Sequence, residues 1–219
     1  MKRTLFGFTA AALLTTSSAS GGLLISGMVD GTNNGGNPKA MEVVALENIA
    51  DLSVYWILRD TNGTTGGPFT QSDSFQLPSV SLSAGDFYYI YGNSDTETQL
   101  EAAGFGDTDS GTAVRDGILN QNGDDIFALS TSNDVADAID AFGLLGQGDT
   151  NFAQNSTAYR PDGSPQNATG VADAGNFDIT AYGSDSSFNA IFGTFQVPEP
   201  SSLALIGLGG LLIARRRRD

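Results

Sequence analysis

The sequence contains no cysteine and no histidine. Without cysteine there is no disulfide framework, so a folded domain must be held together by its hydrophobic core. Zinc and copper sites normally use histidine or cysteine, and Ser-His-Asp or Cys-His catalysis needs a histidine base. Any catalysis would rest on carboxylates, tyrosine or lysine. The composition therefore argues against an enzyme.

Basic residues are scarce between the two ends of the chain. Residues 20–197 contain 23 acidic side chains and only four basic ones, which gives a net charge of −19. Binding to nucleic acid depends on Lys and Arg that neutralise phosphates, so we expect no nucleic-acid partner. An acidic surface favours solubility and attracts cations such as Ca²⁺. Adaptation to salty surroundings explains the same charge equally well.

Neither end contains an apolar run of the roughly 20 residues that a comfortable membrane-spanning helix needs. At the N-terminus, Lys2 and Arg3 precede an apolar run over residues 5–14, and small residues follow. This order predicts a signal peptide over residues 1–20, cleaved after Ala19 or Ser20, and export through the secretion translocon. A buried N-terminal helix is the alternative.

The C-terminal residues 198–219 have three parts in a strict order. A Pro-Glu-Pro motif comes first, an apolar segment over residues 201–214 follows, and a cluster of arginines comes last. The arginines predict that this end stays inside while the domain lies outside. The residues of the motif and the cluster are Pro198, Glu199, Pro200, Arg215, Arg216, Arg217 and Arg218.

This tail resembles the PEP-CTERM sorting signal in all three parts. The resemblance implies recognition by an exosortase and cleavage near the Pro-Glu-Pro motif, in bacteria that build exopolysaccharide or biofilm matrix. We therefore expect an exported protein of the cell envelope. It would be anchored in the membrane by its C-terminal segment before processing, and then lie at the cell surface or outside the cell. A plain tail anchor is the alternative.

Residues 21–197 are expected to form one domain, because no internal repeat divides them. Short runs of β-branched and aromatic residues alternate with Gly, Asn, Asp and Pro, which predicts an all-β sandwich or barrel. One short helix is expected over residues 95–103, capped by Ser94 or Asp95. Residues 30–38 should form a loop, and residues 143–187 looser loops with two or three short strands, ending in the apolar run 191–197. The other expected strands are 23–29, 41–46, 55–59, 74–77, 87–91, 125–129 and 136–142.

Several short motifs of this domain come in the order found in the lamin-tail family. They are the strand with Glu42, the segment Asp51-Leu52-Ser53-Val54-Tyr55, the turn Gly85-Asp86 and the segment Asn122-Gly123-Asp124-Asp125. Residues 23–160 are therefore similar to a lamin-tail domain, which implies an immunoglobulin-like β-sandwich that serves as a binding or structural module without a shared catalytic residue. The sequence departs from the family at Ala45 and Ala84, where Asn and Pro are common.

Four aspartates are candidate ligands of Ca²⁺, because turns let oxygen atoms converge without distorting a strand. They are Asp107, Asp109, Asp124 and Asp125. The segment 107–111 begins like a calcium loop but lacks the glycine and the closing glutamate of an EF-hand. An ordinary turn, in which Asn-Gly adopts positive φ and Asp binds nearby backbone amides, explains residues 122–125 without any ligand.

Two classes of function remain open. One is a non-catalytic envelope or matrix protein whose sandwich binds exopolysaccharide, Ca²⁺ or other matrix proteins. The other is a secreted hydrolase of polysaccharide or phosphodiester, in which Glu42 or Asp140 pairs with Asp124 as in glycosidases. A sugar-stacking face would come from Tyr55, Trp56, Tyr88, Tyr89 and Tyr91, although strand alternation places Tyr88 opposite Tyr89 and Tyr91. The missing histidine and the module resemblance favour the first class.

Overall fold

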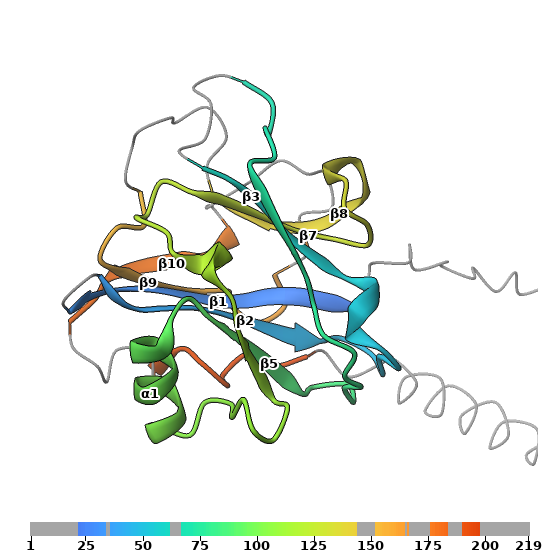
Figure 1. Ribbon diagram of the computed structural model, residues 1–219, viewed down its shortest axis with the longest axis horizontal. Coiled ribbons are helices and arrows are strands. Elements are labelled where there is room, and N and C mark those ends of the chain that lie inside the picture. Colours follow the sequence, from blue (N-terminus) through green and yellow to red (C-terminus); the bar gives the residue numbers. More distant parts are fainter. Residues whose placement is uncertain are drawn as a thin grey trace, which may run out of the picture.

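The computed structural model describes residues 22–33, 36–61, 67–143, 152–164, 166, 176–183 and 190–197. Within these residues the chain forms a six-stranded sheet and a four-stranded sheet, together with one α-helix and three short 3₁₀ turns. Figure 1 shows the four-stranded sheet lying over the six-stranded one. The segment predicted as a signal peptide and the tail from residue 198 onward lie outside the described residues.

The six-stranded sheet has the order β10-β9-β1-β2-β5-β6, and all neighbours are antiparallel except β5 and β6. Its strands are β1 (Leu23–Asn33), β2 (Asn37–Ala45), β5 (Phe87–Tyr91), β6 (Ala113–Arg115), β9 (Ser156–Tyr159) and β10 (Asp178–Ala181). Two or three short strands were expected between residues 143 and 187, and β9 and β10 lie there. Strand β6 was not predicted, because three residues carry too weak a pattern and it forms only by pairing with β5.

The four-stranded sheet is antiparallel throughout and has the order β4-β3-β7-β8. Its strands are β3 (Trp56–Asp60), β4 (Asp73–Gln76), β7 (Ile126–Ser130) and β8 (Ala138–Phe142). In the central strands, Ile57 of β3 pairs directly with Leu129 of β7, and both side chains belong to the main core. All four strands overlap the ranges expected from the sequence, so the all-β prediction is confirmed.

The loop predicted over residues 30–38 is wrong in extent. Strand β1 continues to Asn33 and β2 already starts at Asn37, with Asp30 opposite Lys39 across the ladder. The Lys39 ammonium lies 2.7 Å from the Asp30 carboxylate, and both residues are more than 90% buried. The composition of residues 30–38 predicted a loop. Because Asp30 and Lys39 pair with each other, these polar residues can instead be buried in the strands of a hairpin.

The main hydrophobic core fills the space between the two sheets. Strand β2 contributes Met41 and Val43 to it, whereas the alternate residues Ala40 and Val44 point to the opposite face of the six-stranded sheet. That outer face is also covered, and all nine residues of β2 are buried. The helix and residues 190–197 lie along this face (Figure 1), and their side chains pack against it.

The single helix of the described residues, α1 (Ser94–Ala102), lies against β2 and β5. It was predicted over nearly the same residues, but its N-cap is Asn93 rather than Ser94 or Asp95. The Asn93 side chain accepts a hydrogen bond from the Thr96 backbone N–H at 2.9 Å. Asparagine is among the strongest N-cap residues, and Asp95 instead adds negative charge to the first turn.

Candidate functional sites and the sorting tail

Glu42 is a fully buried carboxylate on the outer face of the six-stranded sheet. One oxygen accepts a hydrogen bond from the Ser26 hydroxyl at 2.7 Å, and the other accepts from the Gly193 backbone N–H at 2.5 Å. The Tyr89 hydroxyl also hydrogen-bonds to this carboxylate. Burial is the main cause that raises the pKa of Glu42 to about 7, while these hydrogen bonds lower it.

Residues 190–197, which we call the strap, lie along this face and are held by more than Glu42. The Phe192 ring packs 5.8 Å from the rings of both Tyr89 and Phe105. A Cβ atom on Gly27 would approach the Phe192 ring to 2.9 Å, so glycine is what lets the ring lie on β1. The sequence indicated an apolar run here. In the structure this run is not a strand, but it packs on the fold as far as Val197, the residue before Pro198.

The end of the strap has its own small apolar cluster. Phe195 is 5% exposed and packs with Leu24 and Val44, and Val197 packs against the same cluster. The backbone N–H of Gln196 donates to Asp162 at 2.7 Å. The Pro-Glu-Pro motif follows Val197 directly in the sequence. The docked part of the chain and the sorting motif are therefore adjacent, with no spacer between them.

Asp140, the second carboxylate considered for catalysis, is buried in an ion pair with Arg160. The guanidinium donates to both carboxylate oxygens at 2.7 and 2.8 Å, and both side chains have 0% exposure. The Phe177 ring lies under the guanidinium, 4.5 Å from centroid to carbon. A substrate cannot reach either partner in this arrangement.

The calcium candidates lie in two different turns. Asp107 and Asp109 fall between α1 and β6, whereas Asp124 and Asp125 immediately precede β7 in the other sheet. The Asp107 carboxylate accepts the Asp109 backbone N–H at 2.8 Å, so it stabilises its own turn. Among the described residues, no group of three acidic side chains is placed to hold a metal ion. Calcium binding stays a prediction.

The turn before β7 confirms the prediction for the Asn122-Gly123 pair only in part, because Gly123 alone of the two has a positive φ and the turn joins no two paired strands. Gly123 has a φ of +91°, and a Cβ atom there would lie 2.2 Å from the Gln154 backbone nitrogen. Its carbonyl accepts the Ala153 N–H at 3.0 Å. Asp124 is 8% exposed, yet its Oδ1 has no hydrogen-bond partner among the described residues. A purely structural role of this turn does not explain why that buried oxygen lacks a hydrogen-bond partner.

The tyrosines do not form a sugar-stacking face. Tyr88 points into the core between the sheets, and Tyr89 and Tyr91 point into the outer cluster, as alternation predicted. Both sides are buried, since none of these three rings is more than 7% exposed, and Tyr55 is buried as well. Trp56 is half-buried against the outer cluster of the four-stranded sheet.

The described fold is thus an acidic two-sheet β-domain whose last segment leads straight into a Pro-Glu-Pro tail. A protein family described as the PEP-CTERM protein-sorting motif matches residues 196–218. The chain therefore carries a PEP-CTERM signal, as the three-part tail predicted, and this signal supports export, membrane anchoring before cleavage and sorting by an exosortase. No curated protein and no solved structure matches the chain.

The match contains every predicted motif residue, from Pro198 to Arg218, although the structure of these residues lies outside the described part. In the part of the chain that the structure does describe, no helix is long and apolar enough to cross a membrane.

Proposed function

We propose that this protein is a non-catalytic module of the cell envelope or extracellular matrix, released from its membrane anchor by an exosortase. The secretion translocon would carry it out, and exopolysaccharide or matrix proteins would be its partners outside. The sorting tail supports the route. The net charge of −19 over residues 20–197 argues against nucleic acid as a partner. The domain would then act by binding or by structure.

The observation that carries the non-catalytic role is the burial of Glu42 and Asp140, each with 0% exposure and each engaged by backbone N–H groups of the fold. A glycosidase needs two carboxylates that flank the scissile bond and face the substrate. Glu42 is covered by the strap and Asp140 is buried against Arg160, so neither carboxylate is available for that chemistry.

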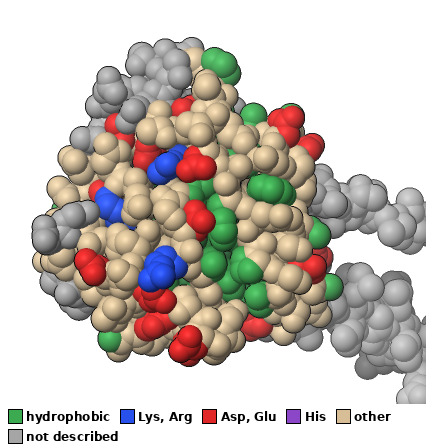
Figure 2. All heavy atoms as spheres, in the orientation of Figure 1, with side chains coloured by type: hydrophobic (Ala, Val, Ile, Leu, Met, Phe, Trp, Pro, Cys, Tyr) green, Lys and Arg blue, Asp and Glu red, His purple; other side chains and the backbone are tan. Residues whose placement is uncertain are grey.

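Three other aspartates, which are half-buried or exposed, stabilise turns. Asp51, Asp116 and Asp134 each cap a 3₁₀ turn by accepting the backbone N–H two residues further on. On the face seen in Figure 2, acidic side chains are spread out, and some lie beside the few Lys and Arg side chains. This use of carboxylates as turn-forming residues supports a scaffold rather than an active site.

We further propose that the domain is a lamin-tail-like, immunoglobulin-type sandwich. The motif residues that suggest this family have roles in building the two sheets. Glu42 fastens the strap, the Asp86 carboxylate accepts the Ser83 N–H at 2.8 Å in its turn, and Gly123 makes the turn before β7. Members of a family defined by such residues would have the same fold but no common catalytic activity.

The test is an assay of the processed protein, collected from cells, against polysaccharides and phosphodiesters. We expect no turnover above background. The matched variants are Glu42→Gln and Asp140→Asn, with Asp73→Asn as a surface control. Hydrolysis by the wild type that either buried-site variant abolishes, while its β-rich far-UV spectrum is retained, would overturn the proposal and favour the hydrolase.

A further inference from the structure

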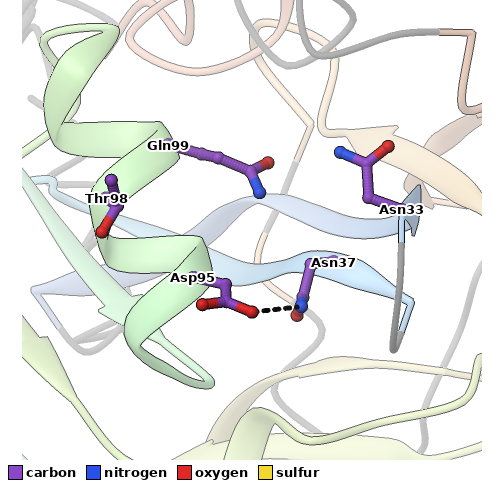
Figure 3. Close-up of a pocket in the computed structure, with 5 residues that line it drawn as sticks. All are labelled: Asn33, Asn37, Asp95, Thr98 and Gln99. Carbon is purple, nitrogen blue, oxygen red and sulfur yellow. Dashed lines mark hydrogen bonds between the residues drawn. The ribbon is translucent and has the colours of Figure 1, made fainter.

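The outer face of the six-stranded sheet is covered by two segments that are attached to the fold in different ways. Helix α1 is the crossover between β5 and β6, which pair with each other. It is also fastened to the β1–β2 hairpin, where the Asn37 amide donates to the Asp95 carboxylate at 3.4 Å (Figure 3). The Lys39 backbone N–H donates to the Thr96 hydroxyl at 2.8 Å. The helix is thus tied to paired strands at both of its ends.

The strap has no such tie to the strands. No residue from 190 to 197 belongs to a strand, so the strap can leave the face without breaking any strand pairing. Two buried phenylalanine rings hold it, together with two backbone N–H groups that donate to carboxylates. The Gly193 N–H donates to Glu42 at 2.5 Å, and the Gln196 N–H donates to Asp162 at 2.7 Å. A segment outside the strand ladders opens at a lower free energy than a core strand does.

The tether between the docked strap and the apolar anchor segment is short. Five residues separate Val197 from Leu203, the first leucine of that segment. The Cα atoms of these two residues are six backbone steps apart and lie at most about 20 Å from each other. The headgroup layer of a bilayer takes up about 5–7 Å of that distance. While the strap is docked, the domain must therefore lie close to the membrane surface. Release of residues 190–197 would lengthen the tether by up to about 28 Å.

The docked strap also occupies chain that a processing enzyme would bind. Extended peptides are recognised through their main-chain hydrogen-bonding groups and through pockets for alternate side chains. Just upstream of the Pro-Glu-Pro motif, the Gln196 N–H is already bonded to Asp162. The Phe195 ring is already packed against Leu24 and Val44. The fold and an enzyme that binds this stretch cannot use the same groups at the same time.

We propose that the docked strap shields the sorting motif, so that an exosortase processes the folded precursor only after the strap has left the outer face. This inference rests on the proposed function, in which an exosortase releases the domain. The free energy of strap docking then sets how long the folded protein stays held at the membrane. When opening and closing are faster than cleavage, the rate of cleavage follows the population of the open form. Each weakening of the strap should therefore speed processing.

The experiment follows the full-length precursor by pulse-chase in cells that contain the exosortase. Phe195→Ala removes a buried anchor, and we expect processing at least about tenfold faster than in the wild type. Asp162→Ala removes only the exposed acceptor of the Gln196 N–H and should speed processing at least about threefold. The matched control is Asp134→Ala, because this aspartate is also exposed and accepts one backbone N–H, from Ala136 at 2.8 Å. It lies in the turn before β8, and its loss should change the rate by less than about twofold.

A second precursor carries about ten Gly and Ser residues between Val197 and Pro198. This spacer lengthens the tether without touching the strap. Processing should become at least about tenfold faster than in the wild type and should no longer respond to Phe195→Ala.

Hydrogen exchange at the Gly193 and Gln196 amides of the processed protein measures strap opening directly. Phe195→Ala and Asp162→Ala should raise these exchange rates by factors similar to those found for processing. If Phe195→Ala does not fold, Asp162→Ala still decides the matter, since it changes only an exposed side chain.

Equal processing rates for the wild type, Asp162→Ala and the spacer form would overturn the inference. The motif would then be open to the enzyme while the strap is docked, or would be cut before the strap docks. Faster processing of a strap variant without faster exchange at Gly193 and Gln196 would overturn it as well.

Failure of this inference and failure of the proposed function give different results. If the precursor is processed at the same rate with and without the spacer, release by an exosortase stands and the strap does not control it. If neither precursor is processed in cells that contain the enzyme, the proposed release itself fails.

Discussion

Arg160 and Asp140 together take the place of a missing strand next to Ile25. The Ile25 N–H donates to the Asp140 carboxylate at 2.9 Å, and the Ile25 carbonyl accepts from the Arg160 Nε at 2.8 Å. The pairing of β1 with β9 stops at Gly27 and Tyr159, so this peptide group of Ile25 has no strand partner on that side. Because Asp140 belongs to β8, the same pair also joins the two sheets.

Removal of one partner from this pair should be strongly destabilising. Asp140→Asn leaves a buried guanidinium without its counter-charge, and we expect a loss of about 3–5 kcal/mol in the free energy of unfolding, measured with urea. The matched control is Asp73→Asn. It breaks the pair of Arg59 with a half-exposed carboxylate and should cost under about 1 kcal/mol. Equal losses for the two variants would show that the buried pair has no special role.

Glu42 should make the stability depend on pH in the direction opposite to that of an ordinary carboxylate. Its pKa is raised in the folded state to about 7 from 4.5, so between these values the folded state binds the proton that the unfolded state has lost. The contribution of Glu42 to stability is therefore greatest below pH 4.5 and falls until the pH passes about 7. The full change is on the order of 3 kcal/mol.

Other carboxylates change stability over the same range, so the measurement is a comparison with Glu42→Gln. We expect the unfolding free energy of the wild type to fall relative to that of the variant by roughly 3 kcal/mol between pH 4.5 and pH 8. Parallel pH profiles would mean that Glu42 ionises at an ordinary pKa, and hence that the strap does not bury it in solution.

The strap should behave as part of the core rather than as a linker. Phe192→Ala removes a ring that is 2% exposed and packs against Tyr89, and we expect a loss of about 3–5 kcal/mol in unfolding free energy. Gln196→Ala changes an exposed side chain of the same segment and should cost under about 0.5 kcal/mol. Limited proteolysis should cut within the strap of the first variant well before that of the second. Equal cutting of both would argue that the strap is a loose linker.

The sorting motif should control the fate of the chain. Replacing Pro198 and Pro200 by alanine should leave an unprocessed, membrane-held form in cells that contain an exosortase, because the motif precedes the apolar anchor directly. Mass spectrometry and cell fractionation give the result, and a strain without the enzyme is the reference for the uncleaved form. If wild type and variant have the same mass and location, the motif is an ordinary linker.

Calcium, if bound, should act at the turn before β7. Asp124 has a buried oxygen without a partner, whereas Asp107 already bonds to its own turn. We expect the melting temperature to rise more in Ca²⁺ than in Mg²⁺ at equal ionic strength, by the equivalent of about 2.7 kcal/mol at a hundredfold excess over the dissociation constant. Asp124→Asn should abolish the difference. The double variant Asp107→Asn and Asp109→Asn should keep it.

Equal shifts with both ions would leave only screening of the acidic surface. In that case all four aspartates are turn residues.

The local elements were predictable because their signals are local. Strand β5 begins and ends at the residues where its aromatic run does, and Gly123 in the turn before β7 has the positive φ that was predicted for it, although Asn122 does not. The order of Pro-Glu-Pro motif, apolar segment and arginines likewise sufficed to predict the sorting tail. Alternation even separated Tyr88 from Tyr89 correctly. It did not indicate that both faces of that strand are covered.

What the sequence by itself determined is therefore the all-β class, most strands and the helix, since spacing along the chain is enough to specify them. Its resemblance to a known sorting signal added the export route. Only the tertiary structure decided which polar residues are structural. Glu42 meets Gly193 across 151 positions, and Asp140 meets Ile25 across 115. The sequence alone cannot distinguish a buried structural carboxylate from a catalytic or metal-binding one. The partners that neutralise it become its neighbours only when the two sheets pack and the strap closes over the outer face.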